Sequence, residues 1–107
     1  MHADTRERLP NRRRHEVLEF EFGGLTYTAG IGRFADGRLA EVFLNTAKPG
    51  SQAENAARDA AILASLALQR GATAADLRHS LPRLNNGQAA GPVGHVLELI
   101  SQDGESR

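Results

Sequence analysis

The sequence predicts an α+β domain of two layers, a three-stranded antiparallel meander packed by one long and two shorter helices. Three observations support this fold class. Polar and apolar residues alternate in short segments between residues 16 and 45, tight-turn sequences separate these segments, and the apolar spacing becomes helical from residue 52. Strands followed by helices in this order are typical of α+β domains.

Three segments have the alternation of half-buried strands, namely residues 16–22, 25–34 and 38–45. Gly23-Gly24 and Ala35-Asp36-Gly37 separate them, and both are hairpin-type turn sequences. The second strand has Gly30 and Gly32 on one face, which leaves room for close packing. We therefore expect the long helix to lie flat on this glycine-bearing face.

The long helix is expected over residues 52–69, because alanine and leucine recur there at helical spacing. Leu63 belongs to its expected apolar stripe, which Ile62 and Leu66 broaden. Ser51 and Glu54 have the spacing of a capping box, and Gly71 supplies the stop.

Two shorter helices are expected after Gly71. Thr73 and Asp76 have the spacing of a second capping box, which opens a helix ending near Pro82 with Leu84 as a further apolar position. Pro92 suits the first turn of the last helix. The expected organisation is a basic arm, flexible or docked, over 1–14, one domain over 15–101 and a frayed tail over 102–107.

Composition excludes several kinds of chemistry. The formal net charge is zero, so no global field attracts nucleic acid or a membrane surface. There is no cysteine, which excludes disulfides and thiolate metal sites. No apolar run approaches the roughly 20 residues of a membrane span, and the start lacks the apolar core of a signal peptide. We expect a cytoplasmic protein.

The first candidate site is the mouth of the long helix, formed by Lys48, Gly50 and Ser51. Gly50 lets the backbone turn, and the N–H groups of residues 51–53 together with Lys48 suit a phosphate or carboxylate. The spacing is not that of a Walker loop. A plainly capped helix with an exposed lysine is the alternative interpretation.

The second candidate site is the cluster Arg12, Arg13 and Arg14, with Arg8 before it. Such a cluster suits nucleotide phosphates or an acidic partner surface, and a solvated basic arm is the alternative. The four histidines have no i,i+4 pair and no accompanying cysteine, so we expect no metal or other cofactor. Glu41 is expected either to pair with Arg33 or Arg38 or to be exposed. No catalytic constellation is visible.

Five short strings, in this order and spacing, resemble one known family. They are RLPNRR at 8–13, DGRLAEVF at 36–43, KPGS at 48–51, ASLALQRG at 64–71 and AGPV at 90–93. Together they resemble the C-terminal accessory (TSCPD) domain of adenosylcobalamin-dependent, class II ribonucleotide reductases, which also occurs as short stand-alone proteins. Where the family has Thr-Ser-Cys-Pro-Asp, residues 89–93 keep only Pro92. Because the cysteine of the motif is missing, a thiol or metal role of this motif does not carry over from the family to this chain.

The resemblance implies an accessory or regulatory module of deoxyribonucleotide synthesis. Such a module would bind a nucleotide or another anion, or dock on a reductase catalytic chain. Its relatives are ribonucleoside-diphosphate reductases, whose thiol chemistry a chain without cysteine cannot perform by itself. Three alternatives stay open: a structural or interaction protein that forms a homodimer, nucleic-acid binding through the arginine arm, and an unrelated small enzyme.

Overall fold

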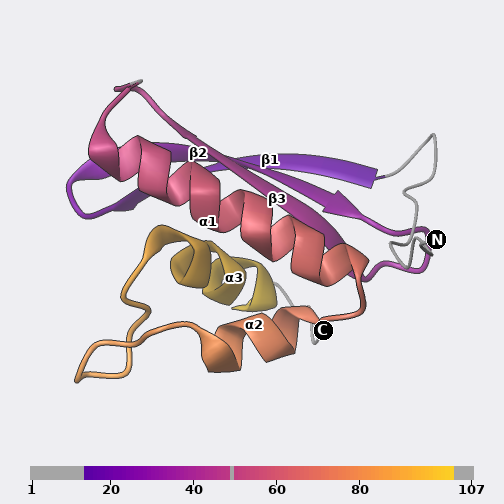
Figure 1. Cartoon of the computed structure of the whole chain (residues 1–107). Helices are drawn as coiled ribbons and strands as arrows, with labels where there is room; N and C mark the ends of the chain where they lie inside the picture. The colour runs from indigo at the N-terminus through magenta and orange to yellow at the C-terminus, as the bar shows by residue number, and fades with distance from the viewer. Residues whose placement is uncertain (1–13, 49, 103–107) are drawn as a thin grey trace, which may run out of the picture.

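Three strands followed by three helices make up the domain in the computed structural model, which describes residues 14–48 and 50–102 of the chain (Figure 1). The elements are β1 (Arg14–Phe22), β2 (Leu25–Arg33), β3 (Leu39–Thr46), α1 (Gln52–Gln69), α2 (Ala74–Ser80) and α3 (Pro92–Gln102). The helices form one layer on one side of the sheet (Figure 1). The predicted fold class is therefore confirmed, with strand ends shifted by one or two residues.

The sheet is an antiparallel meander in the order β1-β2-β3. Gly23 and Gly24 close the first hairpin with φ values of +59° and +81°, a left-handed conformation that favours glycine at both positions. The β1–β2 register runs without a break from Phe22↔Leu25 to Arg14↔Arg33. The β2–β3 register shifts between Gly32 and Arg33, so β3 has one extra residue there, as in a β-bulge.

The core lies between the inner face of the sheet and the helices. The sheet contributes large apolar side chains, whereas α1 contributes mainly alanine and α3 contributes branched residues. The buried set includes Phe20, Tyr27, Ile31, Val42, Leu44, Ala57, Ala61, Ala64, Leu68, Val93, Val96, Leu97 and Ile100. Small residues on α1 let this helix approach β3 closely, which is the packing role that the alanine-rich sequence predicts.

The expectation that α1 packs on the glycine-bearing face is wrong. Gly30 and Gly32 lie on the opposite, outer face, where their neighbours are side chains of His15, Phe43 and Glu41. The helices cover the other face because most of the bulky apolar residues of the three strands point there. Gly32 allows the Glu41 side chain to approach the sheet closely. Glu41 is only 5% exposed, so the expectation of an exposed sheet position is wrong.

Helix α1 runs along the outer edge of β3 and forms hydrogen bonds with its backbone. The Val42 N–H donates to Ser65 Oγ at 2.9 Å, and the Ser65 hydroxyl donates to the Val42 carbonyl at 3.0 Å. One turn further, Gln69 Nε2 donates to the carbonyl of Ala40, the extra residue of the bulge, at 3.2 Å. These bonds satisfy backbone groups that an edge strand otherwise leaves unpaired.

This packing rotates α1 away from the orientation that its apolar stripe predicts. Leu63 is 66% exposed, and Ile62 and Leu66 are exposed as well, because Ser65 and Gln69 take the positions facing β3. Leu84 is 51% exposed and lies after α2, so its expected apolar role is also wrong. The capping box of Thr73 and Asp76 at the start of α2 is confirmed.

The two outer-face glycines provide a matched test of this arrangement. A Cβ at Gly32 would lie 2.6 Å from Glu41 Cγ, whereas a Cβ at Gly30 meets nothing closer than 3.4 Å. We expect Gly32→Ala to lower the free energy of unfolding by about 1–3 kcal/mol, through displacement of a buried side chain. Gly30→Ala should leave it unchanged or raise it by up to about 1 kcal/mol, because alanine loses less backbone entropy on folding. Urea unfolding of both variants measures the difference, and equal effects would contradict this packing.

Candidate functional site

The start of α1 is fixed by two side chains. Ser51 is the N-cap, and its Oγ accepts the Glu54 N–H at 3.1 Å. The Glu54 carboxylate in turn accepts the N–H of Gly50 at 2.8 Å, and Glu54 is only 4% exposed. The two-way bonding of a capping box is present, but its return bond reaches Gly50 rather than Ser51 itself.

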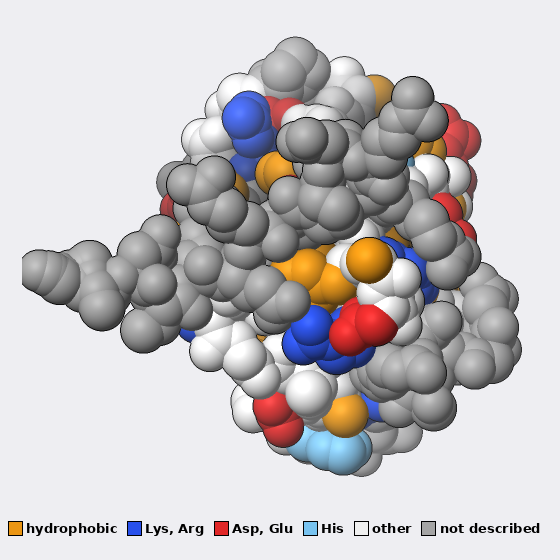
Figure 2. Space-filling view, turned by 90° about the vertical axis from the view of Figure 1, so that its right-hand side faces the viewer, with side chains coloured by type: hydrophobic (Ala, Val, Ile, Leu, Met, Phe, Trp, Pro, Cys, Tyr) orange, Lys and Arg blue, Asp and Glu red, His pale blue; other side chains and the backbone are white. Residues whose placement is uncertain are grey.

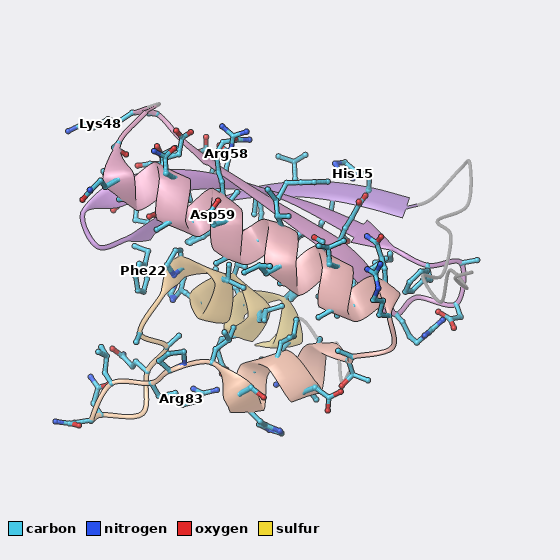
Figure 3. All side chains as sticks on the ribbon, in the orientation of Figure 1. His15, Phe22, Lys48, Arg58, Asp59 and Arg83 are labelled. Atoms are coloured by element: carbon cyan, nitrogen blue, oxygen red, sulfur yellow. The ribbon has the colours of Figure 1, made fainter. Side chains whose placement is uncertain are left out.

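Donor groups remain at this helix mouth. In the described part of the chain, no acceptor pairs with the N–H groups of Ser51, Gln52 and Ala53. Lys48 is exposed, and Figure 3 shows its side chain at the same end of α1, pointing away from the domain. These groups favour an anion, whereas the Glu54 carboxylate beside them opposes one. The mouth therefore has donors and a cation together with one resident negative charge.

The predicted arginine cluster falls largely outside the described residues. Arg12 and Arg13 precede them, and Arg14 is the first residue of β1 rather than part of a separate arm. Figure 3 places His15, the next residue, at the opposite end of the domain from Lys48. The described residues thus do not bring Arg14 and the helix mouth into one site.

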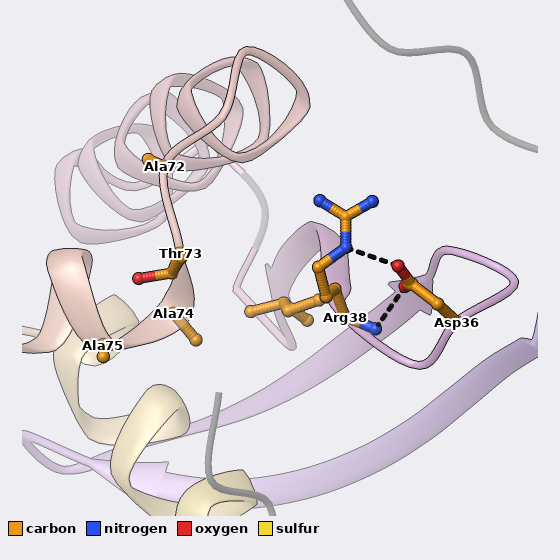
Figure 4. Close-up of a pocket in the computed structure, with 7 residues that line it drawn as sticks. Asp36, Arg38, Ala72, Thr73, Ala74 and Ala75 are labelled. Carbon is orange, nitrogen blue, oxygen red and sulfur yellow. Dashed lines mark hydrogen bonds and ion pairs between the residues drawn. The ribbon is translucent and has the colours of Figure 1, made fainter.

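A cavity of about 550 Å³ lies at the end of the domain where β2 turns into β3, and sequence reasoning did not predict it. Its lining residues are Asp36, Arg38, Leu39, Ala72, Thr73, Ala74 and Ala75 (Figure 4). Figure 2 looks onto this end and shows hydrophobic side chains beside basic and acidic ones. The Asp-Gly-Arg turn sequence was the available signal, because it sets a guanidinium two residues from a carboxylate.

The polar wall of this cavity is an ion pair. Arg38 Nε lies 2.7 Å from Asp36 Oδ2, and the Arg38 N–H donates to Asp36 Oδ1 at 3.0 Å. The hydrogen bond from the Arg38 backbone, followed by that from its side chain, lowers the pKa of Asp36. The Arg38 guanidinium also stacks 4.6 Å from the Phe34 ring centroid. Since Asp36 stays ionised beside it, the charge of Arg38 is largely compensated here.

A second hollow lies between β3 and the exposed flank of α1. It has a volume of about 260 Å³ and is lined by Phe43, Leu44, Asn45, Arg58, Ala61 and Ile62. Phe43 is 44% exposed and Ile62 is 50% exposed, and Leu66 continues the apolar surface one turn along α1. We call Phe43, Ile62 and Leu66 the β3–α1 patch. A cluster of exposed large apolar side chains is typical of protein-interaction surfaces.

The histidines lie in separate surroundings. His95 packs 5.3 Å from the ring centroids of both Phe20 and Phe22, His15 lies over Gly30, and His79 is exposed. Over residues 14–48 and 50–102, no group of three or more His, Asp or Glu side chains could hold a metal ion.

Comparison with known proteins gives one informative similarity. Over 66 residues the chain is 38% identical to the vitamin B12-dependent ribonucleotide reductase of Agrobacterium fabrum, an alignment that covers 62% of this chain. The chain spans only about 5% of the length of that reductase. No family model matches the chain, and no solved structure matches it. The chain thus contains a region related to B12-dependent ribonucleotide reductase.

None of the helices in the described ranges combines the length and the apolar character needed to cross a bilayer.

Proposed function

We propose that this protein is a non-catalytic accessory module of ribonucleotide reduction that docks on the catalytic chain of a B12-dependent reductase. The observation that carries the proposal is the 38% identity to such a reductase over 62% of the chain. The order of the five sequence strings supports the finer assignment to a TSCPD-type accessory domain.

We infer an accessory role because these residues lack the thiol groups that the reduction needs. The resemblance implies a reduction that uses thiols, and none of the 107 residues is cysteine. A role in deoxyribonucleotide synthesis then requires reacting groups outside these 107 residues, which we assign to the catalytic chain of a reductase. This protein would act on that chain by binding it or by presenting a ligand to it.

The β3–α1 patch is the surface we assign to the catalytic chain. Phe43 and Ile62 border a hollow that could receive an apolar side chain, and Arg58 at its rim supplies a charge. Apolar anchors in a pocket with a polar rim are the usual arrangement of a binding hot spot. The patch lies on the exposed flank of α1, so docking there leaves the core contacts of this helix intact.

Ile62 and Leu63 are adjacent on α1 and provide matched variants for this surface. Ile62→Glu should weaken binding to a purified B12-dependent reductase catalytic chain at least about tenfold, because docking would desolvate a carboxylate where the unsubstituted chain has an apolar anchor. Leu63→Glu introduces the same charge outside the hollow and should bind normally. Biolayer interferometry measures both affinities. Lack of binding by the unsubstituted chain, or equal losses in the two variants, would contradict the docking proposal.

A second candidate function is nucleotide binding at the mouth of α1, favoured by the N–H groups of residues 51–53 beside Lys48. The ligand's phosphate would accept these hydrogen bonds, and Lys48 would add an ionic contact. The residues that the sequence assigns to this site are Lys48, Gly50 and Ser51, whereas Arg12, Arg13 and Arg14 form a separate candidate cluster for phosphates.

Calorimetric titration with ribo- and deoxynucleotides tests this second function. Lys48→Ala should weaken binding about tenfold, since it removes a charged partner. Glu54→Gln should strengthen binding, because it removes the competing negative charge while its amide oxygen can still accept the Gly50 N–H. Arg58→Ala, which removes an exposed cation further along α1, is the control. No heat with any nucleotide at millimolar concentration would exclude the helix mouth as a nucleotide site.

A further inference from the structure

The two edges of the sheet differ. Helix α1 closes the β3 edge through Ser65 and Gln69, whereas no described strand or helix pairs with the outer edge of β1. This edge is nine residues long, has an unbroken register with β2, and contains no proline or lysine. Bulges, prolines and lysines are the usual protection of an edge strand against pairing. Charged side chains protect an edge as well, and β1 contains Arg14, Glu16, Glu19 and Glu21. This edge can therefore accept only a strand whose charges complement its own.

The backbone groups available on this edge can be assigned. The backbone N–H and C=O of Val42 point away from β2 and bond to Ser65. Ile31, the residue opposite Val42 on β2, therefore directs its N–H and C=O toward β1, where it pairs with Glu16. Strand residues alternate in direction, so His15, Val17, Glu19 and Glu21 direct their N–H and C=O groups outward. An antiparallel partner would form its ladder hydrogen bonds with residues of this set.

Charges along β1 favour one particular partner. Arg14 and His15 begin the strand and are followed by Glu16, whereas Glu19 and Glu21 lie near its end. An antiparallel second copy sets the basic start of one strand against the acidic end of the other. Shifts that place Glu16 or Glu19 against its own copy bring like charges face to face and are disfavoured.

A register centred on Phe20 is disfavoured as well, because it sets Glu19 opposite Glu21. Of the registers centred on residues 16–20, those on Val17 and Leu18 remain. The first sets Val17, which is 67% exposed, against its own copy, whereas the second sets it against the carboxylate of Glu19. Leu18 has less to gain from the second register, because it already packs against the core of its own domain. In the first register His15 lies opposite Glu19 on each side of the central pair.

We propose that two copies of this chain pair antiparallel through their β1 edges, with Val17 opposite Val17, and form one continuous six-stranded sheet. The interface consists mainly of main-chain hydrogen bonds along a nine-residue strand. It is small beside those of obligate dimers, so the association is expected in the micromolar range or weaker. The β3–α1 patch lies beyond the opposite edge of the sheet and stays accessible in the dimer.

Sedimentation velocity of the full chain over a concentration series, from about 1 μM to 1 mM, tests the proposal. The unsubstituted chain should show a reversible monomer–dimer equilibrium. Val17→Lys should weaken dimerisation at least about tenfold, because two ammonium groups would face each other. Leu63→Lys, with the same change at a site of matching exposure (66%), should dimerise normally. A monomer at 1 mM, or equal effects of the two substitutions, would overturn the proposal.

A charge exchange tests the register. His15→Glu alone should weaken the dimer, because a carboxylate then faces Glu19, and the double variant His15→Glu/Glu19→His should restore it. A dimer centred on Leu18 would not be restored, since the carboxylate introduced at position 15 would then face Glu21. Such a result would overturn the Val17 register. Circular dichroism of each variant establishes that the monomer is folded before its association is measured.

Discussion

The two hydrogen bonds between Ser65 and Val42 are the interaction on which the rest of the structure depends. One hydroxyl satisfies both the N–H and the carbonyl of the same strand residue, and Ser65 is only 7% exposed. Loss of partners for two buried backbone groups would cost about 1–3 kcal/mol each. This bridge therefore holds α1 against an edge of the sheet and fixes the rotation of the helix about its axis.

That rotation determines which surfaces remain for binding. With Ser65 and Gln69 facing β3, Ile62 and Leu66 point outward beside Phe43 and create the β3–α1 patch. The same closure leaves β1 as the open edge of the sheet. One edge is thus sealed by the helix, and the other is available to a strand. The proposed docking surface and the proposed pairing edge lie at opposite edges of the sheet, so the two proposed associations would not compete.

Much of the fold could be predicted from sequence because the signals are local. Hairpin glycines, capping residues and changes of apolar period specify the order of the elements and, for α1, both of its ends. The side of the sheet that α1 covers was predicted incorrectly, because glycine spacing alone does not reveal that the Glu41 side chain fills the space above Gly32. The rotation of α1 was also missed, since polar Ser65 and Gln69 give no apolar signal. Both errors concern contacts between residues distant in the sequence.

For the candidate sites too, local features were predictable from the sequence, whereas contacts between distant residues were not. The cap at Ser51 was predictable, but the return bond from Glu54 to Gly50, which places a carboxylate at the helix mouth, depends on three-dimensional geometry. The cavity beside Arg38 was not predicted, because it forms only where the β2–β3 turn meets the start of α2. The sequence suggested residues for an anion site, and the structure added the Glu54 carboxylate, whose negative charge opposes an anion there.

Amide hydrogen exchange at Val42, compared between the unsubstituted chain and Ser65→Ala, tests the central claim most directly. Val42 should be protected in the unsubstituted chain, although it lies on an edge strand. In Ser65→Ala it should lose more protection than Ile31 in the strand interior, while Ser80→Ala, at an exposed helix position, should change neither amide. The account would be contradicted if, in the unsubstituted chain, the Val42 amide exchanged as freely as the amides of the loop between α2 and α3.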